Sequence, residues 1–88
     1  MMPLDEETLN VLIGEYLSAY GGEIDISLET IDKSSFTVHF SGRLCRACGI
    51  EEYFDGFVYM LRLSGINASV ENVKEERGGY TVTYRINE

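Results

Sequence analysis

Apolar residues recur at helical spacing in two segments of the chain. Between Asp5 and Tyr20 they return every three or four positions and form one stripe, made up of Leu9, Leu12, Ile13, Tyr16, Leu17 and Tyr20. A second stripe, between about Ile50 and Leu63, consists of Ile50, Tyr53, Phe54, Phe57, Val58 and Leu61. Glycines follow both segments and are typical of helix ends. The pattern therefore predicts two amphipathic helices.

Four other segments alternate apolar and polar residues, which is the pattern of half-buried strands. The first pair, Glu23 to Ile31 and Phe36 to Ser41, is separated by the polar turn at residues 32–35. The second pair, Asn67 to Val73 and Tyr80 to Ile86, is separated by a turn through residues 75–79. Each pair is predicted to form a β-hairpin.

The predicted order is helix, strand, strand, helix, strand, strand, and its two halves resemble each other. The letters ISLETI (26–31) parallel ASVENV (68–73), and FTVHF (36–40) parallels YTVTY (80–84). This likeness indicates an internal repeat, although two unrelated hairpins can share such patterns. We expect an α+β fold of two layers, with both helices packed on one face of a four-stranded, mostly antiparallel sheet.

Length and charge narrow the classes of function. With 88 residues, the chain is expected to form a single domain spanning 1–88. Its formal net charge of −8 disfavours nucleic acid and an anionic membrane surface as partners. No apolar run has the length of a membrane-spanning helix, and the acidic start does not resemble a signal peptide. We therefore expect a cytoplasmic protein.

The stretch GRLCRACGIEEYF holds the two cysteines of the chain, Cys45 and Cys48. They lie before the second predicted helix, where the helix dipole and neighbouring arginines favour the thiolate form. Thiolates bind zinc and iron–sulfur clusters, so Cys45 and Cys48 are candidate ligands for either. Two further ligands are needed; Glu51 or Glu52 could supply one, and a homodimer would supply two more sulfurs.

Two other interpretations of the cysteines remain open. Both could be buried packing residues of a plain interaction module, because cysteine is readily buried. A thioredoxin-like redox pair is disfavoured, since that fold places a proline against its thiols and this chain has only Pro3. The single histidine, His39, is interpreted as a solvent-facing or hydrogen-bonded strand residue. No catalytic constellation can be assembled, which predicts a non-enzymatic protein.

The chain from roughly Leu9 to Val73 resembles the C-terminal domain of NifU. The likeness is carried by YLSAYGGEIDI (16–26), by the hairpin ending in FTVHFSG, and by the cysteine pair before a helix. That family holds a labile iron–sulfur cluster, commonly shared across a dimer, and passes it to recipient proteins. The resemblance implies that Cys45 and Cys48 are cluster ligands and that the partners are a second copy and iron–sulfur recipient proteins.

The second half resembles the 4-vinyl-reductase-type domain. Here the likeness is carried by Cys48, FDGF, LSG, ASVENV and GGYTVTYRI. That family is thought to bind small apolar ligands, sometimes with a metal, and Cys48 and Glu71 stand where it tends to have a cysteine and a glutamate. The resemblance implies an apolar pocket between the second helix and the sheet, with Phe54, Phe57, Leu61 and Glu71 as candidate lining residues.

Overall fold

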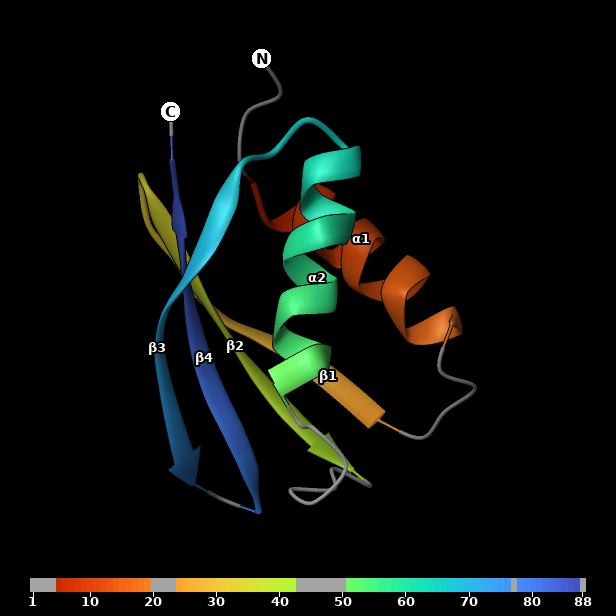
Figure 1. Cartoon of the computed structure of the whole chain (residues 1–88), viewed down its shortest axis with the longest axis vertical. Coiled ribbons are helices and arrows are strands. Elements are labelled where there is room, and N and C mark those ends of the chain that lie inside the picture. Colours follow the sequence, from red (N-terminus) through yellow and green to blue (C-terminus); the bar gives the residue numbers. More distant parts are fainter. Residues whose placement is uncertain (1–4, 20–23, 43–50, 77, 88) are drawn as a thin grey trace.

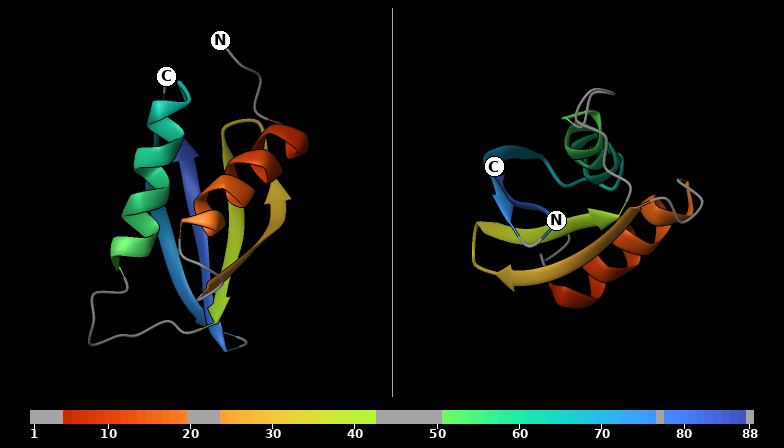
Figure 2. Two further views of the ribbon diagram at one scale, coloured as in Figure 1. Left: turned by 90° about the vertical axis from the view of Figure 1, so that its right-hand side faces the viewer. Right: turned by 90° about the horizontal axis from the view of Figure 1, so that it is seen from below.

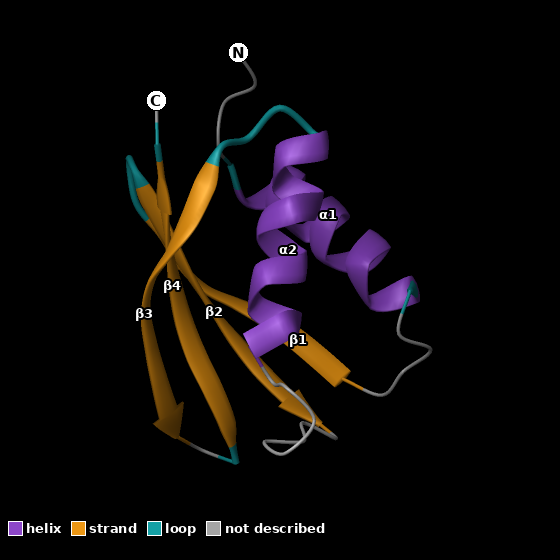
Figure 3. Ribbon diagram, viewed as in Figure 1, coloured by secondary structure: helices purple, strands orange, loops and turns teal. Residues whose placement is uncertain are grey.

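A computed structural model of the chain describes residues 5–19, 24–42, 51–76 and 78–87. The two helices and four strands follow the predicted order: α1 (Glu6–Ser18), β1 (Ile24–Ile31), β2 (Ser35–Gly42), α2 (Glu51–Leu63), β3 (Ala68–Glu76) and β4 (Gly79–Ile86). Both helices cover the same face of the sheet (Figures 1 and 3). The α+β class and its two-layer α-β-β-α-β-β arrangement are confirmed.

Helix α1 begins with a capping side chain. Asp5 is the N-cap, and its carboxylate accepts a hydrogen bond of 2.7 Å from the backbone N–H of Thr8. That hydrogen bond stabilises the charged form and lowers the pKa of Asp5 below its usual value. The predicted stripe faces the sheet, with its buried members being Leu9, Leu12, Ile13 and Tyr16.

The sheet has the strand order β1-β2-β4-β3, and every neighbouring pair is antiparallel. In β2, Phe36, Val38 and Phe40 are buried and face the helices, as the alternation predicts. α1 packs against β1 and α2 packs against β3, so each helix covers the edge strand of its own half (Figure 2).

Aromatic rings hold the two layers together. The ring of Phe57, on α2, lies 5.4 Å from that of Tyr16, 6.3 Å from that of Phe36 and 5.5 Å from that of Tyr84. Phe57 is completely buried, as are Phe36 and Tyr84 to within about one per cent. These contacts join both helices and both central strands, so the two halves share one core.

The predicted repeat has a structural counterpart. Val38 of β2 lies opposite Val82 of β4, and Phe36 lies opposite Tyr84, as an approximate twofold axis between the two strands requires. The edge strands each carry a β-bulge, at Glu29 in β1 and at Glu71 in β3. These two residues occupy the same position in the parallel letters ISLETI and ASVENV.

The second hairpin is longer than the sequence pattern predicts. The pattern predicts a turn at Glu75 and Glu76, but both residues continue β3, where Glu75 lies opposite Tyr80 and Glu76 lies opposite Gly79. Only residues 77 and 78 remain between the strands, and Gly78 has a φ of 73° that glycine adopts without steric cost.

Candidate functional site

An apolar groove runs between α2 and the β3–β4 hairpin. It has a volume of about 350 Å³ and is lined by Glu51, Phe54, Asp55, Val70, Val73 and Tyr80. One wall is the first half of α2 and the other is β3, so the walls come from both layers of the fold. We call it the α2–β3 groove.

A β-bulge places both valines on the wall of this groove. Val70 lies opposite Tyr84 and Val73 lies opposite Val82, and both partners are buried on the helix-facing side of the sheet. Residues three apart on a regular strand would face opposite sides. The extra residue at Glu71 shifts the register, which brings Val70 and Val73 to the same face.

Phe54 connects the groove to the core. Its ring lies 5.0 Å from that of Phe40 and 5.8 Å from that of Tyr80, and only 3% of the residue is exposed. Packing on both sides holds the ring in one position. The inner end of the groove is therefore a preformed aromatic surface.

Two tyrosine hydroxyls fix the first turns of α2 that form the helical wall. Tyr84 donates a hydrogen bond of 3.0 Å to the carbonyl oxygen of Phe54, and Tyr16 donates one of 2.7 Å to that of Tyr53. Burial, followed by the electrostatic effects of Tyr16 and Asp55, raises the pKa of Tyr84 far above its usual value. Gly56 makes room for the second bond, because a Cβ there would lie 2.5 Å from the Tyr16 hydroxyl.

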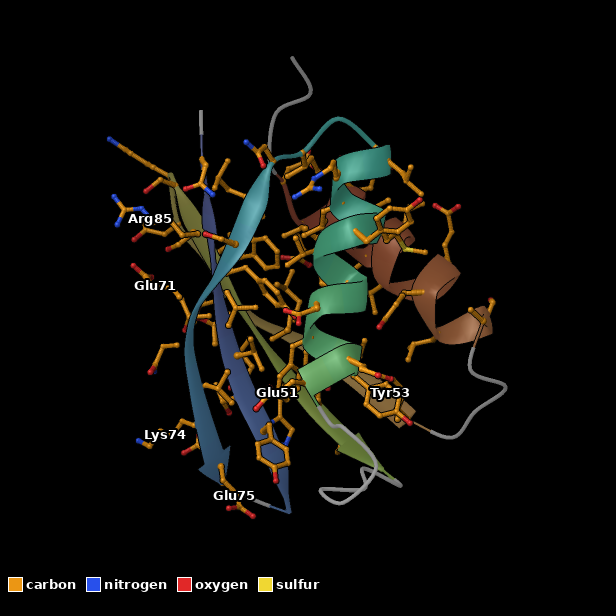
Figure 4. The ribbon with its side chains drawn as sticks, viewed as in Figure 1. Glu51, Tyr53, Glu71, Lys74, Glu75 and Arg85 are labelled. Atoms are coloured by element: carbon orange, nitrogen blue, oxygen red, sulfur yellow. The ribbon has the colours of Figure 1, made fainter. Side chains whose placement is uncertain are left out.

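Two carboxylates stand on the helical side of the groove. Glu51 and Asp55 lie one turn apart on α2, and both are exposed. Figure 4 shows Glu51 at the start of α2, on the side facing β3 and β4, whereas Tyr53 points to the other side of the helix. Neither carboxylate is in a salt bridge within the described ranges 5–19, 24–42, 51–76 and 78–87.

A second groove lies at the matching place in the first half, between α1 and β1. It has a volume of about 260 Å³ and is lined by Glu6, Asn10, Leu28, Glu29, Thr30 and Ile31. When α1 is aligned with α2 and ISLETI with ASVENV, four lining positions coincide: Glu6 with Glu51, Asn10 with Asp55, Leu28 with Val70, and Ile31 with Val73. None of the described residues that line this α1–β1 groove is aromatic.

A larger hollow, of about 460 Å³, lies on the outer side of α1 and reaches Ser64. Its lining includes Glu7, Val11 and Glu15, which are all exposed on one helix. Among its described lining residues there is neither an aromatic residue nor a strand residue. The α2–β3 groove offers the better enclosed apolar surface.

The residues predicted to line an apolar pocket lie in different places. Phe54 lines the α2–β3 groove, whereas Phe57 and Leu61 are completely buried in the core beneath it. Glu71 is exposed, and its carboxylate lies 3.6 Å from the guanidinium of Arg85. Figure 4 shows Glu71 and Arg85 on the side of the sheet away from the helices. The structure thus brings only Phe54 of this set to the groove.

Five lining residues were missed by sequence reasoning, namely Glu51, Asp55, Val70, Val73 and Tyr80. The apolar residues at 70 and 73 carry a usable signal, because a spacing of three within a strand indicates a bulge. Glu51 and Asp55 are one helical turn apart, and Phe54 between them is on the buried stripe. The proximity of Glu51 and Asp55 to β3 depends on tertiary packing, so no local pattern in the sequence predicts it.

The proposed metal ligands Cys45 and Cys48 lie outside the described residues, as do their neighbours from 43 to 50. Among the residues that are described, no group of three or more histidine, cysteine, aspartate or glutamate side chains is placed to hold a metal ion.

His39 belongs to a hydrogen-bonded chain on the open face of the sheet. Thr81 donates a hydrogen bond of 2.8 Å to the carboxylate of Glu76, and its oxygen lies 3.1 Å from Nδ1 of His39. Since the Thr81 hydroxyl has one proton, Nδ1 of His39 is the donor in the second bond. The interpretation of His39 as a hydrogen-bonded strand residue is confirmed.

No protein-family model, curated protein or solved structure matches the chain. No helix of the described part is both long and apolar enough to cross a membrane.

Proposed function

We propose that this chain is a non-enzymatic module that binds a small apolar ligand in the α2–β3 groove. The observation that carries the proposal is the groove itself, with its valine wall and its ordered aromatic inner end at Phe54. Its volume of about 350 Å³ falls in the range of small-molecule sites in proteins. A preformed apolar surface binds ligand without the cost of ordering its own side chains.

The chemistry of the lining favours binding over catalysis. Its described members provide apolar contact area and two carboxylates on the same helix. A nucleophile within hydrogen-bond reach of a base, the arrangement that covalent catalysis uses, is not found among these lining residues.

Binding is tested with a neutral apolar probe, 4-phenyl-1-butanol, added to isotopically labelled protein and followed by NMR. Backbone amide resonances of Val70, Val73 and Tyr80 are expected to shift in a saturable manner. The replacement Val73→Arg fills the groove from an exposed position (42% exposed) and should abolish the shifts. The matched control Ile31→Arg, at the aligned position in the first half (39% exposed), should leave them unchanged. Absence of saturable shifts at the three amides contradicts the proposal.

Metal or iron–sulfur cluster binding at Cys45 and Cys48 is a second candidate function, favoured by their C-x-x-C spacing. If the cysteines bind an iron–sulfur cluster, the chain would act as a cytoplasmic homodimeric cluster carrier for recipient proteins. If they bind zinc, it would be a zinc-binding protein. Anaerobically purified protein is then expected to contain iron and acid-labile sulfide, or zinc, and the Cys45→Ser/Cys48→Ser variant should lose them while staying folded. Metal-free protein with slowly reacting thiols would instead indicate that the cysteines are packing residues.

A further inference from the structure

We infer that the α2–β3 groove selects ligands that carry a positive charge next to an apolar body, such as an arylalkyl amine. This inference rests on the proposed function, because it names the chemical class of ligand for the same groove. It is drawn from the charges around the groove, the aromatic rings in it and the comparison with the α1–β1 groove.

The carboxylates of Glu51 and Asp55 stand one helical turn apart on the same wall. A cation placed between them is attracted by both, and each attraction is stronger beside a low-dielectric apolar wall than in bulk water. An anionic ligand in the same position is repelled by both. The wall thus discriminates ligands by the sign of their charge.

Basic residues of the neighbouring strands point away from this wall. Lys74 lies opposite Thr81, on the open face of the sheet, and its ammonium is 3.9 Å from the carboxylate of Glu76. Arg85 pairs with Glu71 on that same side (Figure 4). The described lining therefore contains no basic side chain that neutralises Glu51 and Asp55. The net charge of −8 further raises the local concentration of cations.

The aromatic lining adds a second preference for cations. Tyr80 is half-buried in the lining, and its ring lies 5.8 Å from that of Phe54, which is 3% exposed, so a ligand in the groove contacts mainly the ring of Tyr80. The electron-rich face of an aromatic ring attracts an ammonium group. An amine whose charge lies near Glu51 can place its apolar body against these rings and the valines.

The α1–β1 groove provides an internal comparison. It keeps an acidic residue at Glu6 but has the neutral Asn10 where the second half has Asp55. Its second carboxylate is Glu29, on β1, and no aromatic ring is among its described lining residues. Two carboxylates one helical turn apart and an aromatic lining therefore occur together in the α2–β3 groove, whereas the described lining of the α1–β1 groove has its two carboxylates on different elements.

Three probes of one shape test the inference: 4-phenylbutylamine, 4-phenyl-1-butanol and 4-phenylbutyrate, with dissociation constants measured by NMR titration at low salt. The amine is expected to bind about tenfold more tightly than the alcohol, because it gains two contacts with exposed carboxylates and a cation–π contact. The carboxylate should bind more weakly than the alcohol. Raising the salt concentration should reduce the advantage of the amine.

Two matched double variants separate the local effect from the overall charge. Glu51→Gln/Asp55→Asn should bring the affinity for the amine down to that for the alcohol when both are measured on this variant. Glu6→Gln/Glu7→Gln changes the net charge by the same amount on α1 and should preserve the tenfold preference.

The possible results distinguish a failure of the charge selectivity from a failure of ligand binding itself. Equal binding of amine and alcohol, or an equal loss of preference in both double variants, overturns the charge selectivity but leaves ligand binding intact. Failure of all three probes to bind overturns the proposed function itself.

Discussion

The two halves of this molecule use the same backbone plan with different side chains. Both have a 13-residue helix over an edge strand that is bulged at a glutamate, and both have a groove between that helix and that strand. The first half lines its groove with polar residues such as Asn10 and Thr30, whereas the second uses Phe54 and Tyr80. The shared backbone creates a hollow twice, and the side chains decide which hollow suits an apolar ligand.

The halves also differ in how they contribute to the core. At aligned helix positions, the first half has Leu9 and Leu12 where the second has Phe54 and Phe57. The aromatic side chains of α2 reach both central strands and α1. Helix α2 is therefore both the wall of the groove and the element on which most of the aromatic packing depends.

The largest expected effect comes from truncating Phe57, the centre of that packing. Phe57→Ala should lower the free energy of unfolding by about 3–5 kcal/mol, because it removes contacts with three rings and leaves a cavity. The aligned Leu12→Ala should cost less, about 2–3 kcal/mol. Urea denaturation of both variants measures the two losses in free energy of unfolding. A larger loss for Leu12→Ala than for Phe57→Ala would contradict the prediction that the packing depends more on α2 than on α1.

The glycines of the two helices should respond in opposite directions. Gly56→Ala introduces a Cβ at 2.5 Å from the Tyr16 hydroxyl and should destabilise the protein by about 1–3 kcal/mol. Gly14→Ala meets no atom within 4 Å and should stabilise it by about 0.5–1 kcal/mol. Adding Tyr16→Phe to Gly56→Ala should recover part of the loss in a double-mutant cycle. If both alanines stabilise the protein equally, the close contact at Gly56 is not a constraint.

Tyr84→Phe makes the second half resemble the first, where Phe40 occupies the aligned strand position. Loss of the bond to the Phe54 carbonyl should cost about 1 kcal/mol. The pKa of Tyr84 is raised in the folded state, so the neutral hydroxyl is favoured there. Its contribution to stability is fully present below about pH 10, the unfolded value, and is lost as the pH rises above it. Denaturation between pH 8 and 11 should show a smaller alkaline loss for Tyr84→Phe than for the wild type.

The smallest effect is expected at the start of α1. The lowered pKa of Asp5 means that its charged form stabilises the helix, and this contribution is lost as the pH falls below about 4, the unfolded value. Asp5→Asn keeps an N-cap side chain but removes the charge. Its urea midpoint should therefore change less than that of the wild type between pH 6 and pH 3. An identical acid response in both proteins would exclude a role for the Asp5 carboxylate.

Local patterns in the sequence were sufficient for the elements and their order. The helical stripes through Leu9 and Phe57 and the alternation at Phe36, Val38 and Phe40 directly reflect which side chains face the core. The similar segments ISLETI and ASVENV around Glu29 and Glu71 indicate the repeat, and both segments have a β-bulge at the aligned glutamate. These features are local, so they can be predicted without knowing the tertiary arrangement.

The groove could not be predicted in the same way. Its wall at Val70 and Val73 depends on a register shift between β3 and β4. Its other wall depends on the position in which α2 packs against β3. Phe57 and Leu61 are on the apolar stripe of α2 and were therefore predicted to line a pocket. They are at the centre of that stripe, where side chains are completely buried in the core. Residues at the margin of the stripe, such as Glu51 and Asp55, line the groove because they flank the buried face.

The most direct test of the central claim compares the two grooves in one experiment. 4-Phenylbutylamine is titrated into ¹⁵N-labelled protein, and amide shifts are followed at Val70 and Val73 and at their aligned positions Leu28 and Ile31. Saturable shifts confined to Val70 and Val73, and absent from the Val73→Arg variant, are the predicted result. Equal shifts at both pairs, or shifts only at Leu28 and Ile31, would contradict the assignment of binding to the α2–β3 groove.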